Sequence, residues 1–266
     1  MSREPDLDPA DPIRVVARLR AAGCVFAEDE ARLLIEAADG PRELAVLVRR
    51  RVEGLPLEHL LGWVEFRGLR LEVDPGVFVP RTRTGFLVER AAAVLPAGPA
   101  VVVDLCCGCG AVGVALAAAS PGVELHCADV DPAAVRCAAR NAAAVGGTAH
   151  LGDLYDALPP ALRGRVDVLA VNAPYVPTDE IRSMPPEARL HEPRVALDGG
   201  PDGLDVQRRV AAGAPEWLAP AGHLLIETGR HQAAGTLAAV TAAGLTAHLR
   251  TDDTIAGTVV LANLSA

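Results

Sequence analysis

The stretch Val-Val-Val-Asp-Leu-Cys-Cys-Gly-Cys-Gly-Ala-Val-Gly, residues 101–113, decides the fold of this chain. A β-branched apolar run ends in an acid, passes through a loop of small residues and continues into the apolar segment 114–117. This order predicts a buried strand, a tight glycine turn and the start of a helix, as in nucleotide-binding α/β folds. Glycine suits such a loop because it adopts positive φ and lets the backbone approach a ligand. Taken alone, the pattern also fits a turn whose small residues serve only packing.

Strand and helix patterns alternate after this stretch. The predicted strands are Val101–Leu105, Glu124–Asp129, Thr148–Asp153, Val166–Asn172 and His223–Thr228, and the predicted helices are Gly113–Ala119, Pro132–Ala144, Val206–Trp217 and Gln232–Ala243. Two final strands, Leu245–Arg250 and Thr258–Leu264, leave no room for a helix between them and should therefore pair antiparallel. The alternation predicts an α/β fold with a Rossmann-like, mostly parallel sheet of about seven strands.

The chain before this sheet has a different pattern. Three short amphipathic helices are predicted, from Pro12 to Gly23, from Glu28 to about Ala38 and from Pro41 to just before Gly54. The runs Trp63–Phe66 and Leu69–Val73 alternate around Arg67-Gly68, which predicts a β-hairpin, and a further helix is expected at Phe86–Leu95. We therefore expect two domains: residues 1–78, a small helical domain for substrate recognition with a hairpin linker, and residues 79–266, which carry the sheet.

Composition limits the class of protein. No apolar run in the 266 residues approaches the roughly 18 residues of a membrane helix, and the acidic start of the chain is unlike a signal peptide, so we expect a soluble cytoplasmic protein. The net charge of −9 argues against an extended nucleic-acid surface. All 25 basic residues are arginine, which excludes lysine Schiff-base chemistry and a P-loop lysine.

Three of the six cysteines, Cys106, Cys107 and Cys109, fall in the glycine loop. Cys106 and Cys109 form a C-x-x-C pair, which could be a redox dithiol or half of a zinc site. No second Cys or His pair with ligand spacing is present, so no metal is expected. We favour small buried residues over redox chemistry, and redox chemistry over a metal.

Polar residues end successive predicted strands: Asp104, Asp129, Asp153 and Asn172. Ligands of such sheets bind at the carboxyl ends of the strands, where these side chains converge. Asp129 lies about twenty residues beyond the loop, where an acid commonly binds ribose hydroxyls, and Asp153 could accept a hydrogen bond from an adenine amino group. Each acid alone could also be a helix N-cap.

The last of these residues opens the sequence Asn172-Ala173-Pro174-Tyr175. It resembles the Asn-Pro-Pro-Tyr motif of methyltransferases that modify planar amino groups, either glutamine amides or the exocyclic amines of adenine. Together with the glycine loop, this resemblance implies S-adenosylmethionine as the cofactor.

Longer segments resemble the HemK/PrmC family. They are Arg51–Gly62, Phe66–Leu69, Val79–Arg81 and His191–Leu204. The family methylates the glutamine side-chain amide in proteins, typically in the Gly-Gly-Gln loop of class I peptide chain release factors. The resemblance implies a Rossmann-like methyltransferase domain, a release factor as protein partner and a monomer that does not bind nucleic acid directly. It also implies cofactor contacts at Asp104, Cys106, Cys107, Gly108, Cys109, Gly110, Asp129, Asp153, Leu154 and Asn172, and catalytic contacts with the target amide at Asn172, Ala173, Pro174 and Tyr175.

The expected chemistry suits these residue types. An amide nitrogen is a weak nucleophile, and the Asn172 side-chain oxygen and the Ala173 carbonyl can each accept one of its N–H groups. Tyr175 can pack against the flat amide. Positioning at about 3–3.5 Å is then the main catalytic contribution, and no histidine is assigned a catalytic role. We expect His59, His191, His223 and His231 to be ordinary polar or capping residues.

Three features depart from the family pattern. Cys106 replaces the usual first glycine of the loop, Ala173 replaces a proline, and Arg83 lies in a segment, residues 80–85, that usually carries two glutamates. These departures suggest a paralogue, which leaves two substrates open: a release factor or another protein. They leave three alternatives open: an adenine-amine methyltransferase, a C-x-x-C redox protein and a non-catalytic protein that binds S-adenosylmethionine.

Overall fold

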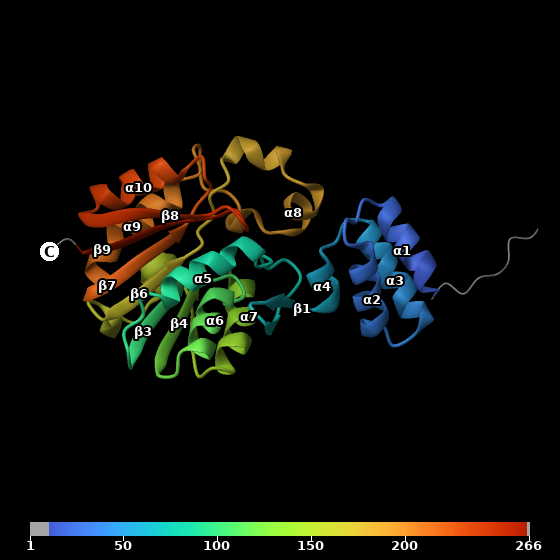
Figure 1. Cartoon of the computed structure of the whole chain (residues 1–266), viewed down its shortest axis with the longest axis horizontal. Helices are drawn as coiled ribbons and strands as arrows, with labels where there is room; N and C mark the ends of the chain where they lie inside the picture. Colours follow the sequence, from blue (N-terminus) through green and yellow to red (C-terminus); the bar gives the residue numbers. More distant parts are fainter. Residues whose placement is uncertain (1–10, 265–266) are drawn as a thin grey trace, which may run out of the picture.

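A computed structural model describes residues 11–264 as a twisted seven-stranded sheet with helices on both faces, preceded by a separate group of helices (Figure 1). The strand order is β5-β4-β3-β6-β7-β9-β8, and β9 runs antiparallel to both of its neighbours. The expected absence of a signal peptide concerns residues 1–10, which lie outside the described residues. The α/β class, the Rossmann-like sheet and the antiparallel final pair are confirmed.

The strands of the sheet are β3 (Ala100–Leu105), β4 (Val123–Asp129), β5 (Thr148–Leu151), β6 (Val166–Val171), β7 (Leu218–Glu227), β8 (Leu245–Asp252) and β9 (Gly257–Leu264). The helices around it are α5 (Gly85–Ala92), α6 (Ala111–Ala119), α7 (Pro132–Ala143), α8 (Pro186–His191), α9 (Asp205–Trp217) and α10 (Ala233–Ala242). Short 3-10 turns η1 (Thr82–Thr84), η2 (Leu154–Ala157), η3 (Pro160–Leu162), η4 (Thr178–Ser183) and η5 (Arg194–Ala196) lie in the connections.

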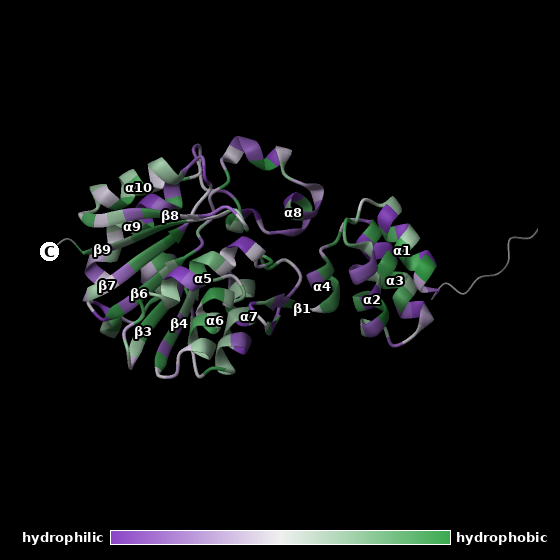
Figure 2. Cartoon of the chain, in the orientation of Figure 1, coloured by the Kyte–Doolittle hydropathy of each residue, from purple (hydrophilic) through white to green (hydrophobic). Residues whose placement is uncertain are grey.

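The sheet separates two hydrophobic cores. Side chains alternate along β3, so that Val102 packs with α5, α6 and α7 on one face, whereas Val101 and Val103 pack with α9 and α10 on the other. Every residue of β3 is buried, and the central strands are mostly apolar (Figure 2), with Asp104 as the charged residue of β3. A strand covered on both faces needs a mostly apolar run, which is why residues 100–103 show no polar alternation.

The helical group consists of α1 (Pro12–Ala21), α2 (Ala27–Ala37), α3 (Pro41–Val52) and the short α4 (Leu57–Leu61). Asp11 caps α1 by accepting the Ile13 N–H at 3.0 Å, and Pro12 supplies a preset φ in the first turn. A third core, which includes Leu19, Leu34 and Leu44, joins these helices. Each of them is too short to be stable alone, so this shared core holds them folded.

A hairpin of β1 (Trp63–Phe66) and β2 (Leu69–Glu72) lies between the helical group and the sheet (Figure 1). Asn141 of α7 accepts the Glu72 N–H and donates to the Glu72 carbonyl, each at 2.9 Å, and also donates to the Cys109 carbonyl. Phe66 packs in the core of α5–α7. The hairpin is thereby fastened to the sheet-bearing part of the chain, and the division at residue 78 stays a prediction.

Several boundaries differ from the predicted ones. The strand expected at 148–153 ends at Leu151; Gly152 still donates its N–H to the Asp129 carbonyl at 3.1 Å, and the chain then turns at Leu154, which has a φ of +51° and begins η2. The helix expected to reach Leu95 ends at Ala92, and β7 begins at Leu218, five residues before the predicted start. The helices α4 and α8 were not predicted, because each spans only one or two turns. Within residues 11–264, no helix combines the length and the apolar character needed to cross a bilayer.

Candidate functional site

A cavity of about 410 Å³ opens at the carboxyl ends of β3, β4 and β6. Its lining includes the loop after β3, the ends of β4 and β6, the turn η1, the start of η2 and a segment that contains η5. The predicted residues that line it are Asp104, Cys106, Cys107, Gly108, Cys109, Asp129, Asp153, Leu154, Asn172, Ala173, Pro174 and Tyr175. The topology thus brings the expected cofactor and acceptor residues to one site.

Gly110 is the predicted residue that does not line this cavity. Its φ is +81°, and its N–H donates to the Cys107 carbonyl at 2.8 Å. A Cβ there would lie 3.4 Å from both the Ala138 Cβ and the Cys127 Sγ. Glycine is therefore required for the turn and for close packing of the loop on α7.

Two acids hold the loop after β3. The Asp129 Oδ2 accepts the Gly108 N–H at 2.9 Å, and the Asp104 Oδ2 accepts the Gly113 N–H at 2.8 Å. Cys106 adopts a φ of +58°, a left-handed conformation in which a side chain is unfavourable. The glycine expected at this position would fit that backbone without strain.

Burial controls the ionisation of both acids. Asp104 is almost completely enclosed, and burial raises its pKa to about 8 against the opposing hydrogen bond from Gly113. Burial also raises the pKa of Asp129, whereas the N–H groups of Asp131 and Gly108 lower it. Asp104 consequently serves as a support for the loop, while half-buried Asp129 presents its carboxylate at the cavity wall.

Asp104 makes folding stability dependent on pH. Its folded pKa lies above the unfolded value of about 3.9, so the folded state loses stability as pH rises from about 4 to 8. We expect Asp104→Asn, which can still accept the Gly113 N–H, to gain stability relative to the parent by the order of a few kcal/mol at pH 8, with little gain at pH 4. Urea unfolding at the two pH values measures this difference. A gain or loss that is equal at both values would contradict it.

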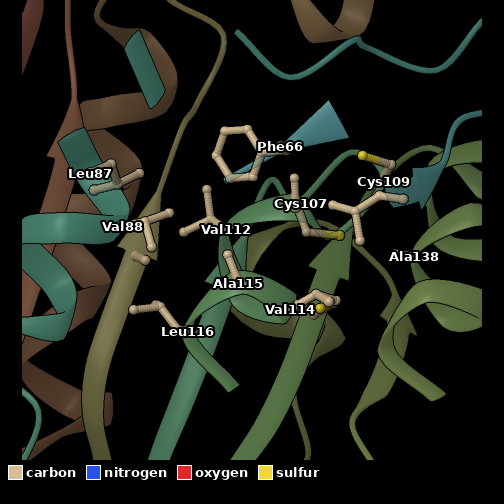
Figure 3. Close-up of a cluster of buried hydrophobic side chains, with 14 of the residues drawn as sticks. Phe66, Leu87, Val88, Cys107, Cys109, Val112, Val114, Ala115, Leu116 and Ala138 are labelled. Atoms are coloured by element: carbon tan, nitrogen blue, oxygen red, sulfur yellow. The ribbon is translucent and has the colours of Figure 1, made fainter. Parts of the chain in front are cut away.

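The cysteines of the loop do not face one another as a dithiol. Cys107 and Cys109 pack in the core beneath α6 and α7, close to Phe66 and Val112 (Figure 3), whereas Cys106 packs against the core on the other face of the sheet. Burial raises the pKa of the Cys106 and Cys109 thiols, so neither is a ready thiolate. This arrangement removes the basis for the redox alternative.

Asp153 and Leu154 close the cavity beyond β5. Leu154 is buried with a φ of +51°, and Asp153 is exposed and accepts a hydrogen bond from the Arg209 Nη2 at 2.7 Å. Both Asp153 and Arg209 line the cavity. The ion pair places the Arg209 guanidinium beside Asp153, the acid that we expect to bind adenine.

Asn172 lies at the end of β6, where its side-chain orientation is set by Thr84 of η1. The Asn172 Nδ2 donates to the Thr84 Oγ1 at 3.5 Å, and Thr84 is only 2% exposed. The Asn172 Oδ1 has no hydrogen bond to any of residues 11–264. The amide therefore offers an acceptor to the cavity.

The Thr84 hydroxyl gives a sharp test of this orientation. We expect Thr84→Val, which preserves the shape, to lower kcat roughly tenfold and to leave KM for the cofactor unchanged, because one hydrogen bond of about 1–1.5 kcal/mol is lost. Steady-state kinetics measure both constants. Thr236→Val, which removes another fully buried hydroxyl, away from the cavity, is the matched control. Equal kcat for Thr84→Val and the parent would refute the positioning role.

The segment 197–203 contacts the chain after Asn172 closely and forms hydrogen bonds with it. The Val176 N–H donates to the Leu197 carbonyl and the Gly199 N–H to the Val176 carbonyl, both at 2.9 Å. The Gln232 Nε2 donates to the Tyr175 carbonyl at 2.8 Å. Gly203 approaches Tyr175 so closely that a Cβ would lie 2.3 Å from the Tyr175 oxygen. The acceptor motif is thus held by main-chain contacts on both sides.

Two arginines stand at the same end of the cavity. The Arg83 Nη2 donates to the Tyr175 hydroxyl at 2.5 Å, and the Arg83 Nε lies 3.4 Å from the Glu227 Oε1. Arg81 donates to the Glu192 Oε1 at 2.6 Å. Burial raises the pKa of Glu227 and of Glu192, and the neighbouring arginines oppose that rise.

Sequence reasoning missed several of these groups. Thr84, Glu227 and the cavity-lining residues Pro193 and 195–198 were not assigned to the site, although residues 191–204 were matched to the family. Of the four histidines predicted to be ordinary, His59 bonds the Val77 carbonyl through its Nε2 at 2.8 Å, and none of the four lines the cavity. Among residues 11–264, no group of three or more His, Cys, Asp or Glu side chains is placed to bind a metal ion.

Known proteins resemble this chain in sequence and in fold. Residues 69–200 match the methyltransferase small domain. A release factor glutamine methyltransferase of Mycolicibacterium smegmatis is 39% identical over 232 residues, covering 86% of this chain and 82% of that protein. A 4-amino-L-phenylalanine/4-methylamino-L-phenylalanine methyltransferase of Streptomyces pristinaespiralis is 37% identical over 246 residues, covering 90% of this chain and 83% of that protein. A methyltransferase of Pyrococcus furiosus shares the fold with a TM-score of 0.55 at 15% identity, over 74% of this chain and 89% of its own.

Proposed function

Since this chain belongs to the release factor glutamine methyltransferase family, we propose that it transfers a methyl group from S-adenosylmethionine to a glutamine side-chain amide in a protein. The resemblance to the HemK/PrmC family is thereby confirmed. The protein substrate that we propose is a class I peptide chain release factor. The monomeric state expected from the resemblance stays a prediction.

The lining of the cavity fits the cofactor. The Asp129 carboxylate can accept ribose hydroxyls, the loop 106–109 lets the backbone approach, and Asp153-Leu154 can hold the adenine. When bound, S-adenosylmethionine supplies a methyl group activated by a sulfonium ion. The acids at this end also favour a cationic ligand over a neutral one.

One observation carries the proposed chemistry: the Asn172 amide donates to Thr84 and so leaves its oxygen to accept. An incoming amide nitrogen can give one N–H to this oxygen and the other to the Ala173 carbonyl. Both hydrogen bonds restrict the nitrogen to one orientation, with its face toward the cofactor end of the cavity. Positioning of this kind can supply several kcal/mol of the barrier reduction, and no strong base is needed, since the proton leaves after transfer.

A second candidate acceptor is an aromatic amine on a free amino acid. The similarity to the Streptomyces pristinaespiralis enzyme favours it, because that enzyme acts on such an amine and matches 90% of this chain. Arg83 also favours it, since a cation replaces the acids that the family usually has near the acceptor. An aromatic amine presents a flat NH2 group that the same two acceptors can bind.

Methyl transfer from labelled S-adenosylmethionine into a cell extract tests the proposal. Label that is released by protease, absent with Asn172→Ala and mapped to a glutamine supports it. Label in the small-molecule fraction supports the aromatic amine, and nuclease-sensitive label supports the adenine alternative. Cofactor binding without label in any fraction would contradict all three and leave the non-catalytic alternative.

A further inference from the structure

The cavity has opposite charges at its two ends. Three acidic side chains, Asp129, Asp131 and Asp153, line the end around the loop, where Arg209 pairs with Asp153, while Arg81 and Arg83 line the end that holds Tyr175. The positive sulfonium ligand and the acceptor thus meet environments of different sign. An acceptor that carries an anion is favoured at the arginine end.

The two arginines differ in what they contact. Arg81 donates to the Glu192 Oε1 at 2.6 Å and stacks on the Phe78 ring at 4.9 Å. Arg83 lies 3.4 Å from the Glu227 Oε1 and donates to the Tyr175 hydroxyl. Arg83 is therefore the arginine that contacts the acceptor motif.

Arg83 also has unused donors at the cavity. A guanidinium has five N–H donors, and one Nη2 hydrogen is used by the Tyr175 hydroxyl. The Nη1 group has no partner among the described residues, and the side chain is 42% exposed. Two parallel N–H groups of a guanidinium match the two oxygens of a carboxylate.

We propose that Arg83 binds a carboxylate of the acceptor, which makes the cavity select acceptors that carry an acid near the methylated nitrogen. The inference rests on the proposed methyl transfer to a flat NH2 group at Asn172. Arg83 contacts the Tyr175 hydroxyl, and its chain neighbour Thr84 contacts Asn172, so the acid binds beside the acceptor motif. The carboxylate could belong to a small aromatic amine or to an acidic residue beside a target glutamine.

Two matched acceptor pairs distinguish these sources. The first pair is 3-(4-aminophenyl)propanoate and 4-propylaniline, which differ by the carboxylate. The second is a peptide with glutamine followed by glutamate and the same peptide with leucine in place of the glutamate. For each compound, KM and the inhibition constant against the other acceptors are measured with S-adenosylmethionine present.

In the parent protein we expect one pair to show a preference of roughly 10- to 100-fold for its acidic member, the range expected for a hydrogen bond between ionised groups. Arg83→Gln should remove this preference. Arg81→Gln lowers the charge by the same amount and should keep it. Because Arg83→Gln leaves Glu227 without its cation, the double variant Arg83→Gln, Glu227→Gln is measured beside it and should lack the preference as well.

Other outcomes would overturn the proposal. Equal affinity for both members of each pair, or no binding of either acid, shows that no carboxylate is bound. An equal loss on both members in Arg83→Gln shows that Arg83 only positions Tyr175. The label-transfer experiment on cell extract remains a separate test, so methyl transfer without acid preference leaves the proposed function intact.

Discussion

Replacing Asn172 by alanine is expected to lower kcat by at least about 100-fold and to preserve most of the affinity for S-adenosylmethionine. The side-chain oxygen of Asn172 is the acceptor that we assign to one N–H of the target amide, and its direction is fixed by Thr84. Without it, the nitrogen keeps a single hydrogen bond, to the Ala173 carbonyl, and rotates away from the line of attack. A misplacement of about 1 Å is enough for a loss of this size.

Kinetics and cofactor binding, measured on the same preparation, test this expectation. Asn172→Asp is the informative companion, since it keeps an acceptor oxygen but loses the donor to Thr84, and it should retain more activity than Asn172→Ala. Both variants should remain folded because Asn172 lines the cavity and is only partly buried. Full turnover by Asn172→Ala would remove the assigned role.

The second large effect is expected for Gly203→Ala, although residue 203 does not line the cavity. Gly203 has a φ of +75°, and an added Cβ would lie 2.3 Å from the Tyr175 carbonyl oxygen and 2.1 Å from the Gln232 Nε2. The left-handed backbone costs about 1–2 kcal/mol, and relief of the overlap costs about 1–3 kcal/mol more. The Gln232 side chain can turn away, but the overlap with the Tyr175 main chain forces Tyr175 to move, and we expect activity to fall about 100-fold.

Gly146→Ala is the matched control for this substitution. Gly146 has a φ of +73°, but a Cβ there meets no heavy atom within 4 Å. Gly146→Ala should therefore lose only the stability that the left-handed backbone costs, and its activity per folded molecule should be unchanged. Thermal unfolding measures the backbone strain in both variants. Turnover measures the displacement of Tyr175, which we expect only in Gly203→Ala. Similar activity losses in both variants would show that the close contact between segment 197–203 and the acceptor motif has no special role in activity.

The parts of the fold and site that the sequence predicts are local. The loop 106–110 and the residues 172–175 each follow a buried strand directly, so apolar pattern and motif identify them together. The carboxyl ends of parallel strands meet at one edge, which brings Asp129 and Asn172 to one cavity without further information.

The missed parts depend on contacts between distant positions. Thr84 and Asn172 are 88 positions apart, and no pattern in either segment indicates their hydrogen bond. The insertion of β9 between β7 and β8 likewise depends on strand order, which local periodicity does not contain. Cys106 and Cys109 pack against opposite cores, and Cys106 has a φ of +58°, neither of which spacing alone could predict.

The attachment of the hairpin has an evolutionary consequence. Asn141 holds the hairpin by the main-chain N–H and carbonyl of Glu72, so these two hydrogen bonds do not depend on the side chain of residue 72, although the Glu72 carboxylate also pairs with Arg140 of α7. The helices α1–α3 have a core of their own, so their outer surface, away from the Arg51–Glu187 ion pair with α8, can accumulate substitutions without disturbing the cavity. During divergence, the same catalytic part of the chain can therefore be combined with N-terminal helices whose surfaces differ. New partners can be acquired at residues 11–61 while the chemistry is inherited unchanged.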